Sequence, residues 1–478
     1  MVAVGPAGTS MPRLSWPAVR RLPPGARRWV LLALAAILLL GGGLRFHAAA
    51  TPDPQLSPDE RSYAKLALSL TRGTYGDRET GLKRPLHWPP GAPALFAASR
   101  VVDDDPDFPV AYYLQALVAT LLIAVCFAIA AVAAGPLAGL IAAALVAFYP
   151  PLITLTASLQ SEPLGALLVA LGVLAATWAL RRDGRLRWWA LSGALFAAAV
   201  LTRTDLLLGP PLVAAVVGLV LWKRPGGALR PALRAAGVLL AAYLLVLAPW
   251  TIYVSERAGK FTPVTEGDAA ALFVGTYLPG KGTTYGMKRV LGDQVRARNP
   301  ELRGVENYRL EAQPVLDLIA ERRPSLTREA ALQAEARENL RRYALGRPVA
   351  FAGMMLDKVR RTWFLSSRAG SLQKSKATRV YHVILVSACC LLMLVAIARR
   401  RSAVAGICAV LVAYSMLLHA VFVAKPRYNL PLIPLLIVGG VVAGAALLAA
   451  RRSALARDGE PVGERDEDRV HTLVAGDP

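Results

Sequence analysis

An acidic pair, Asp59 and Glu60, opens a predicted amphipathic helix and is the first candidate for chemistry in this 478-residue chain. Ser57 is a natural helix N-cap, Pro58 suits the first helical position, and Glu60 completes a capping box. Glu60 therefore has a structural explanation. Asp59 has none beyond the tolerance of a helix dipole for an acid in the first turn, so it is the candidate functional carboxylate.

The helix that follows the acidic pair has one apolar stripe and ends at Gly73. The stripe has helical spacing and consists of Tyr63, Leu66, Ala67 and Leu70. Arg61, Lys65 and Ser69 are expected off this stripe. An amphipathic helix of this kind is expected to lie along a membrane surface.

A rigid, proline-rich turn over residues 82–93 gathers Lys83, Arg84, His87 and Trp88. The two cations are suited to a lipid phosphate. Trp88 has two interpretations: it stacks on a sugar, or it belongs to an interfacial belt of Trp and snorkelling cations.

These candidates must be positioned by membrane-spanning helices. The chain is 55% hydrophobic with a mean hydropathy of +0.43, and its apolar residues fall into runs of about 18–25, long enough to span a bilayer. The four cysteines lie inside these runs and form no disulfide or metal pattern. The first run resembles a signal peptide but is interpreted as a retained helix. The predicted spans are near 28–46, 109–134, 136–157, 163–180, 188–202, 205–222, 233–251, 379–398, 403–422 and 429–450.

The Lys and Arg residues set the predicted topology. With the N-terminus inside, nineteen lie in the inside segments and three in the short outside connections, as the positive-inside rule requires. We therefore assign the net charge of +23 to topology and not to nucleic acid. The expected division is a cytoplasmic tail (1–27), a transmembrane core (28–251) with an outer loop (47–108), an extracytoplasmic segment (252–378), terminal spans (379–450) and a disordered cytoplasmic tail (451–478).

Three further charged residues lie at the predicted outer face. Arg203 and Arg427 lie on short outside connections, where the positive-inside rule disfavours cations, so an anion is expected to compensate each charge. The alternatives are a lipid phosphate, lipid headgroups in general or, for Arg203, an ion pair with Asp205. Glu162 lies at a helix start, where the helix dipole stabilises an acid, so its position does not require a function.

The long segment 252–378 is expected to cover the site. Glycines near 275–282 indicate loop, Thr327 is expected to cap a helix reaching Leu345, and Met354 to Leu365 is expected to form a second helix on the membrane. His382 is isolated, no metal motif is found in this segment, and whether the protein uses a divalent metal is left open.

Several motifs, in order, resemble those of GT-C polytopic glycosyltransferases, with glycosyltransferase family 39 and its bacterial relatives as the nearest likeness. These relatives include protein O-mannosyltransferases, lipid A aminoarabinose transferases and the RgtA/B/C/D-like domain. The resemblance runs from about residue 45 to 440. Its motifs are Asp59-Glu60 with Tyr63-Ala64, Arg84-Pro85 through Pro89-Pro90-Gly91, Ser161-Glu162-Pro163-Leu164, Leu201-Thr202-Arg203, Pro249-Trp250, Ala334 through Arg347-Pro348 to Trp363, and Arg427-Tyr428-Asn429-Leu430-Pro431. Aminoarabinose transferases have Lys-Pro where this chain has Arg84-Pro85, so a cation is kept.

The resemblance implies an all-α integral membrane fold of the GT-C type, with about ten spans, amphipathic juxtamembrane helices in the first outer loop and a long outer segment before the eighth span. It implies inverting transfer of a sugar from a polyprenyl phosphate to an envelope acceptor at the outer face of the cytoplasmic membrane. Such a reaction needs a base and cations at the leaving phosphate.

On this interpretation Asp59 is the base, and Glu60 and Glu162 are acceptor-site or second acids. Lys83, Arg84, Arg203 and Arg427 are the phosphate ligands, and Tyr63, His87, Trp88 and Tyr428 contact substrate.

Two other classes compete with this interpretation. A transporter or lipid-linked sugar flippase would place charges at the bilayer midplane and often show an internal repeat; spans 28–46 and 429–450 carry no midplane charge, and no repeat is seen. A non-enzymatic assembly factor would not need a lone carboxylate beside basic, proline-rich turns.

Overall fold

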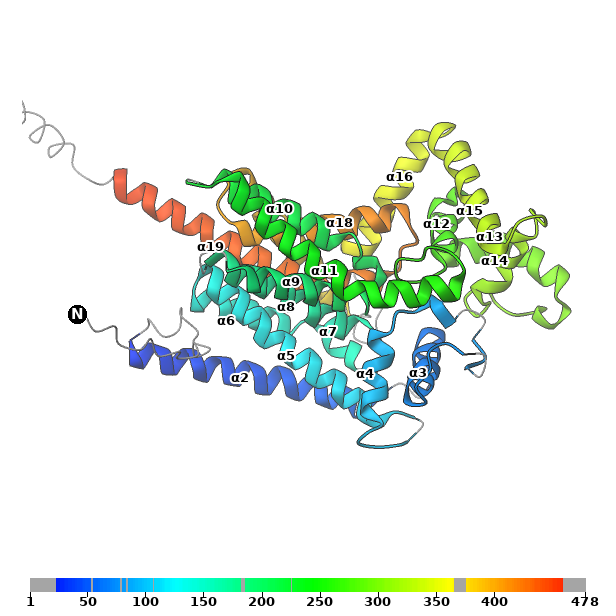
Figure 1. Ribbon diagram of the computed structural model, residues 1–478, viewed down its shortest axis with the longest axis horizontal. Helices are drawn as coiled ribbons and strands as arrows, with labels where there is room; N and C mark the ends of the chain where they lie inside the picture. The colour runs from blue at the N-terminus through cyan, green and yellow to red at the C-terminus, as the bar shows by residue number, and fades with distance from the viewer. Residues whose placement is uncertain are drawn as a thin grey trace, which may run out of the picture.

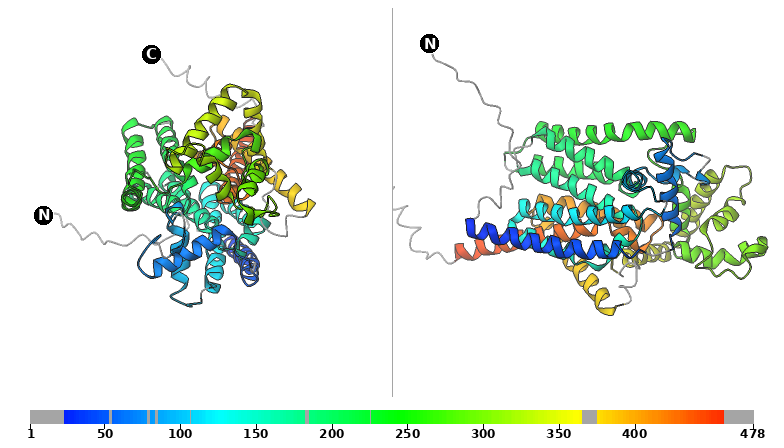
Figure 2. Two further views of the ribbon diagram at one scale, coloured as in Figure 1. Left: turned by 90° about the vertical axis from the view of Figure 1, so that its right-hand side faces the viewer. Right: turned by 90° about the horizontal axis from the view of Figure 1, so that it is seen from below.

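The computed structural model describes residues 23–52, 55–77, 80–82, 85–105, 107–181, 185–224, 226–364 and 375–458. Within these residues every regular element is helical. The helices form a long bundle with a smaller helical lobe at one end (Figure 1). We call the end where α2 (Pro24–Ala49) begins and α19 (Ile433–Asp458) finishes the terminal end. The opposite end, which carries α3 (Pro58–Thr71), α4 (Gly91–Ser99) and the smaller lobe, is the loop end, and the right-hand view of Figure 2 shows the same arrangement.

Eight helices of the described chain are long and apolar enough to cross a membrane, and a bent pair makes up to nine. A further apolar helix, α9, is shorter. Each of the ten predicted spans thus corresponds to one helix or one bent pair, although the number of true crossings stays a prediction. The bundle consists of α2 (Pro24–Ala49), α5 (Pro109–Ala134), α6 (Pro136–Ala147) with α7 (Pro150–Thr154) and η3 (Leu155–Ala157), α8 (Glu162–Arg181), α9 (Leu186–Val200), η4 (Thr204–Leu206) with α10 (Gly209–Lys223), α11 (Leu229–Ala258), α17 (Lys376–Ala398), α18 (Ala403–Val421) and α19 (Ile433–Asp458).

The bundle core is built from apolar side chains that are closed to solvent on α5, α8, α9, α18 and α19. Small residues allow close helix contacts, as at Gly193 of α9, where a Cβ would lie 2.0 Å from the carbonyl oxygen of Leu239 in α11. Helix interfaces rich in small residues are typical of membrane bundles. The helix α11 continues through Pro249 and past residue 251, the predicted end of the seventh span, to Ala258.

The third predicted span is bent by 60° between α6 and α7. Arg45 of α2 is buried at this break, and its guanidinium donates to the carbonyl oxygens of Ala147 at 2.8 Å and Val146 at 2.9 Å. The hydroxyl of Thr156 donates to the carbonyl oxygen of Arg45 at 3.1 Å. Carbonyls at a helix end have no intrahelical donor, so Arg45 takes the place of the missing turn.

Two helices of the first loop lie at the loop end, α3 (Pro58–Thr71) and α4 (Gly91–Ser99), with η2 (Pro85–His87) between them. The predicted stripe on α3 is confirmed for Tyr63, Leu66 and Ala67, which are buried. Ser69, expected off the stripe, is buried as well, because its hydroxyl is 2.9 Å from that of Thr74 in the turn that follows.

The lobe between α11 and α17 has its own apolar core. Its elements are α12 (Asp268–Thr276), η5 (Leu278–Gly280), α13 (Thr284–Arg298), η6 (Pro300–Leu302), α14 (Ala312–Ala320), α15 (Arg328–Asn339), η7 (Leu340–Leu345), α16 (Pro348–Val359) and η8 (Arg360–Phe364). The helix capped by Thr327 is confirmed and continues as η7 to Leu345. The second predicted helix begins earlier than Met354, at Pro348, and its predicted end, Leu365, lies outside the described residues.

Gly275 was predicted to be loop and lies in α12 instead. A Cβ there would be 2.3 Å from the carbonyl oxygen of Val421, so this glycine allows α12 to approach the end of α18. The ammonium of Lys358 is buried at the same junction and donates to the carbonyl oxygens of Gly275 at 2.9 Å and Val421 at 3.4 Å. Burial lowers the pKa of Lys358 to about 7.

Candidate active site at the loop end

The first turn of α3 carries the acidic pair, and the two acids have different surroundings. One carboxylate oxygen of Glu60 accepts the amide of Ser57 at 2.7 Å, and the Ser57 hydroxyl accepts the amide of Glu60. The predicted capping box is therefore confirmed. The other oxygen of Glu60 accepts the amide of Leu159 at 2.9 Å, so Glu60 also fastens α3 to the segment before α8.

Asp59 is instead paired with cations from the far end of the sequence. Its Oδ2 accepts a hydrogen bond from the guanidinium of Arg427, 368 residues away, and lies 3.6 Å from Nζ of Lys425. Burial alone would raise the pKa of Asp59, but the charges of Lys425 and Arg427 and the hydrogen bond outweigh burial and hold it below its ordinary value. Asp59 is therefore ionised at neutral pH, and 29% of its side chain is exposed.

Glu162, the first residue of α8, brings a second carboxylate to the same guanidinium. Its Oε1 lies 3.4 Å from Nε of Arg427 and 3.0 Å from a terminal nitrogen of Arg203. The Glu162 side chain is almost fully buried. Arg427 therefore lies between Asp59 and Glu162, and the first loop, α8 and the loop before α19 meet at this arginine.

Arg203 continues the chain of charges. It is bidentate to Asp205, with nitrogen–oxygen distances of 2.8 and 3.1 Å, and a third nitrogen donates to the hydroxyl of Ser161 at 3.1 Å. The pairing with Asp205 that the sequence left as an alternative is thus observed. We call Asp59, Glu162, Arg203, Asp205, Lys425 and Arg427 the charged cluster.

Aromatic side chains of the first loop line one side of the charged cluster. The Tyr63 hydroxyl donates to Ser161 at 3.2 Å. The rings of Tyr63 and Trp88 meet edge to face with centroids 6.5 Å apart, and those of Trp88 and His87 at 4.7 Å. Nδ1 of His87 lies 2.8 Å from the carbonyl oxygen of Glu266, which joins the first loop to the segment after α11.

Tyr428 lies on the other side, in η10 (Pro426–Asn429). Its ring centroid is 5.8 Å from the guanidinium carbon of Arg203 and 5.7 Å from Nζ of Lys425, distances typical of cation–π contacts. The imidazole of His419 is 5.0 Å from the same ring and 3.7 Å from Oδ2 of Asp205.

Two atoms at the centre of the charged cluster have unused hydrogen-bonding capacity. Oε2 of Glu162 and Nε of Arg427 are buried, and neither has a hydrogen-bond partner among the described residues. The side chain of Asn429, also buried, has both polar atoms in this condition. Buried polar atoms are normally satisfied, so a polar ligand at this place would supply what the protein lacks.

The structure therefore brings together most of the predicted site residues: Asp59, Tyr63, His87, Trp88, Glu162, Arg203, Arg427 and Tyr428. Lys83 and Arg84 lie outside the described residues. No group of three or more His, Cys, Asp or Glu side chains suited to a metal occurs in the described part of the chain. Lys425, Ser161 and His419 were not assigned roles from the sequence. Lys425 was recognisable as a second cation two positions before Arg427, whereas nothing in the sequence marks His419.

A family model described as dolichyl-phosphate-mannose-protein mannosyltransferase matches residues 87–253, which run from η2 to near the end of α11. None of the curated proteins matches the sequence.

Solved structures with similar folds include the archaeal oligosaccharyltransferase AglB from Archaeoglobus fulgidus, in complex with an inhibitory peptide and a dolichol-phosphate. Its TM-score is 0.53 at 15% identity, over 94% of this chain and 54% of that one. The apo form of the Archaeoglobus fulgidus oligosaccharyltransferase has a TM-score of 0.55 at 15% identity, over 90% of this chain and 52% of that one. ArnT from Cupriavidus metallidurans in the apo state has a TM-score of 0.41 at 18% identity, over 87% of this chain and 78% of that one. The chain thus spans about half the length of the oligosaccharyltransferase, and the likeness establishes the predicted fold.

Proposed function

We propose, from the premise that this chain is a membrane glycosyltransferase of the GT-C class, that it transfers a sugar from a polyprenyl phosphate to a hydroxyl group of an envelope acceptor. The acceptor is a lipid, a glycan or a protein. In this proposal the loop end faces the outside of the cytoplasmic membrane, and the terminal end faces the cytoplasm.

One observation carries the proposal: Arg427 contacts both Asp59 and Glu162. The candidate base and a candidate phosphate ligand come from separate motifs and lie side by side. Inverting transfer needs a carboxylate and a cation near one another, because a proton leaves the acceptor hydroxyl while negative charge develops on the leaving phosphate.

The proposed reaction is a single displacement. The acceptor oxygen attacks the anomeric carbon, the bond from that carbon to the phosphate oxygen breaks, and polyprenyl phosphate leaves with the electron pair. The hydroxyl proton passes to Asp59. A phosphodiester donor gives a phosphomonoester product whose added charge favours cations, so the leaving group needs no proton.

Arg427 and Arg203 are the described cations best placed for the phosphate. Nε of Arg427 lies 3.4 Å from Oε1 of Glu162 but makes no hydrogen bond to any described residue, and a phosphate oxygen is a matching acceptor. Tyr63, His87, Trp88 and Tyr428 would then form the walls of the sugar and acceptor pocket. The dolichol-phosphate in the AglB complex supports a polyprenyl-linked donor here by analogy of fold.

The test is transfer by the purified, full-length protein. A synthetic polyprenyl-phosphate sugar is supplied with candidate acceptors, and the release of polyprenyl phosphate and the anomeric configuration of the product are measured. We expect one inverted glycosidic product per polyprenyl phosphate released. A retained configuration would refute the single displacement.

The transporter alternative predicts a different result. Vesicles containing the protein would move the sugar-carrying lipid between leaflets, with no new glycosidic bond in the presence of any acceptor. Leaflet exchange is therefore measured in the same preparation. Exchange without product would contradict the proposed function.

A further inference from the structure

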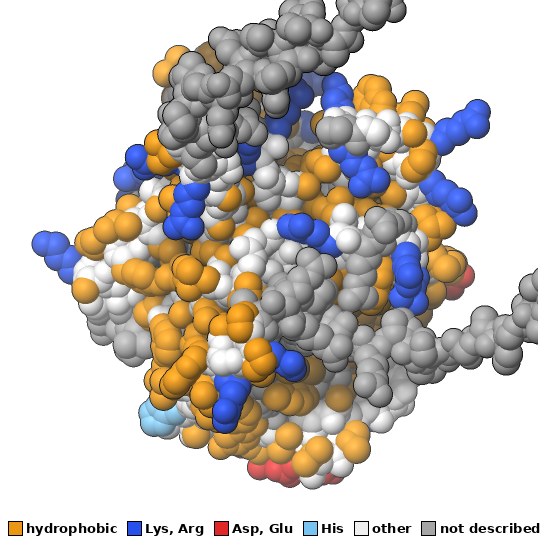
Figure 3. Space-filling view, turned by 90° about the vertical axis from the view of Figure 1, so that its left-hand side faces the viewer, with side chains coloured by type: hydrophobic (Ala, Val, Ile, Leu, Met, Phe, Trp, Pro, Cys, Tyr) orange, Lys and Arg blue, Asp and Glu red, His pale blue; other side chains and the backbone are white. Residues whose placement is uncertain are grey.

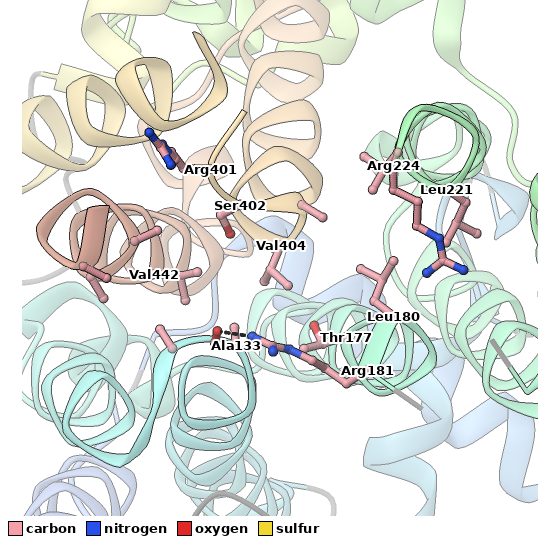
Figure 4. Close-up of a pocket in the computed structure, with 16 residues that line it drawn as sticks. Ala133, Thr177, Leu180, Arg181, Leu221, Arg224, Arg401, Ser402, Val404 and Val442 are labelled. Atoms are coloured by element: carbon pink, nitrogen blue, oxygen red, sulfur yellow. Dashed lines mark hydrogen bonds between the residues drawn. The ribbon is translucent and has the colours of Figure 1, made fainter. Parts of the chain in front are cut away.

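A cavity of about 450 Å³ lies at the terminal end of the bundle, at the opposite end from the charged cluster. The ends of α5, α8 and α10, the middle of α19 and the start of α18 surround it (Figure 4). Since the charged cluster lies at the loop end, the proposed transfer reaction gives this cavity no role.

Three arginines stand on different sides of the cavity in Figure 4: Arg181 at the end of α8, Arg224 after α10 and Arg401 before α18. None of the described residues that line the cavity is acidic. Arg181 donates to the carbonyl oxygen of Ala133 at 2.6 Å. None of the ion pairs found among the described residues involves any of the three arginines.

The positive-inside rule accounts for arginines at this end of the molecule, and Figure 3 shows many Lys and Arg side chains on this face. All three arginines are exposed and line the same cavity, where an anion bound among them would reduce the repulsion between their charges. Ala403 and Val404, the first residues of α18, also line the cavity, and the first amides of a helix lack intrahelical acceptors.

Most of the described lining residues other than the arginines are apolar, among them Leu180, Leu221 and Val442, and Thr177 and Ser402 are the polar exceptions. A hydrocarbon chain attached to an anion would therefore find a largely apolar surface. Basic pockets between membrane helices are a known form of lipid headgroup site, and guanidinium groups match phosphate in geometry as well as charge.

We propose that this cavity is a second binding site, which takes a phosphate group. A lipid headgroup and a free phosphate share this chemistry. In either case Arg181, Arg224 and Arg401 contact the phosphate, and the apolar walls contact whatever is attached to it. The site is independent of the transfer reaction.

The test uses the purified full-length protein with three probes: fluorescent phosphatidylglycerol, the matched phosphatidylcholine, and inorganic phosphate. The site variant combines Arg181→Gln, Arg224→Gln and Arg401→Gln. Its control combines Arg187→Gln, Arg234→Gln and Arg451→Gln, which removes the same charge from residues that do not line the cavity.

The wild type is expected to bind phosphatidylglycerol or inorganic phosphate. We expect the site variant to bind that same anionic probe at least about tenfold more weakly, because several charge-assisted hydrogen bonds are lost. The control variant should bind within about twofold of wild type. A separate variant, Ala446→Phe, keeps all three arginines and fills the cavity, and it should weaken binding as well.

The probes distinguish the two sources of phosphate. Cavity-dependent binding of phosphatidylglycerol that inorganic phosphate does not displace supports a lipid headgroup. Cavity-dependent binding of inorganic phosphate supports a free phosphate ester. Equal losses in the two triple variants, wild-type binding by Ala446→Phe, or no binding of either anionic probe would overturn the proposal.

Discussion

Replacing Asp59 by Asn separates a catalytic carboxylate from a structural ion pair. Asn fills the same space and is well tolerated near a helix start, but it cannot take a proton from a hydroxyl group. The ion-pair partner Arg427 keeps Glu162 at 3.4 Å, so the cation is not left alone.

The size of each effect follows from these surroundings. Loss of a partly exposed ion pair typically costs about 1 kcal/mol or less, which corresponds to a change in thermal midpoint of about 2–4 °C or less. Loss of a general base typically costs roughly 10²–10⁴ in rate, equivalent to about 3–5 kcal/mol in the activation free energy. A structural role alone cannot produce the larger effect.

Glu60→Gln is the matched control, and its expected signature is the opposite. The two carboxylate oxygens of Glu60 accept the amides of Ser57 and Leu159, whereas Gln has one acceptor oxygen. One buried amide loses its partner, at a cost of about 1–3 kcal/mol in the free energy of unfolding. Turnover per folded molecule should stay near wild type.

The assay is sugar transfer by detergent-stable protein, normalised to the folded fraction from a thermal unfolding curve. Near-normal turnover by Asp59→Asn would refute the assignment of the base. An equal loss of turnover in Glu60→Gln would show that the two acids act together and that their division into base and cap is wrong.

Three further predictions concern the pKa of Asp59, the pKa of Lys358 and the topology of the chain. Arg427→Gln removes one of the cations that lower the pKa of Asp59, while Lys425 remains, so this pKa should rise. In a pH–rate profile the acid limb should move to higher pH, and an unmoved limb would contradict the assignment of Asp59. Because the pKa of Lys358 is about 7 in the folded protein and ordinarily 10.5, the unfolded state binds more protons between these values, so stability should rise with pH from 7 to about 10; thermal midpoints measured across this range should lose that slope in Lys358→Met. Topology reporters placed at 226 and 320 should score on the cytoplasmic and outer sides, and an outer signal at 226 would break the assignment of spans from that point.

The spans could be predicted because each one needs only a local property, a long apolar run with cations at one end. The capping box was equally local: Ser57 and Glu60 lie within one turn, and α3 begins where they place it. Gly275 was misjudged as loop because its role depends on a neighbouring element: it permits a close approach to Val421.

The charged cluster was only partly predictable. The motif residues could be chosen from their order, but spacing cannot reveal that Arg427 contacts Asp59 across 368 residues. Spacing also cannot show that a carboxylate oxygen of Glu162 and Nε of Arg427 make no hydrogen bond to any described residue. That depends on how the first loop, α8, the turn after α9 and the loop before α19 pack together. His419 could not be predicted either, since its relevance comes only from its distance to Asp205 and Tyr428.

The contact between Arg45 and the break after α6 has a consequence for biogenesis. The chain emerges from its N-terminus at roughly 5–20 residues per second, so Arg45 of α2 is made several seconds before the carbonyls of Val146 and Ala147. When α6 is synthesised, the guanidinium group of Arg45 that donates to its last carbonyls is already present on α2. A shortened chain that begins after α2 would leave those carbonyls without their donors, and unsatisfied backbone groups inside a membrane protein are costly. The first helix is in this sense a template for the third span.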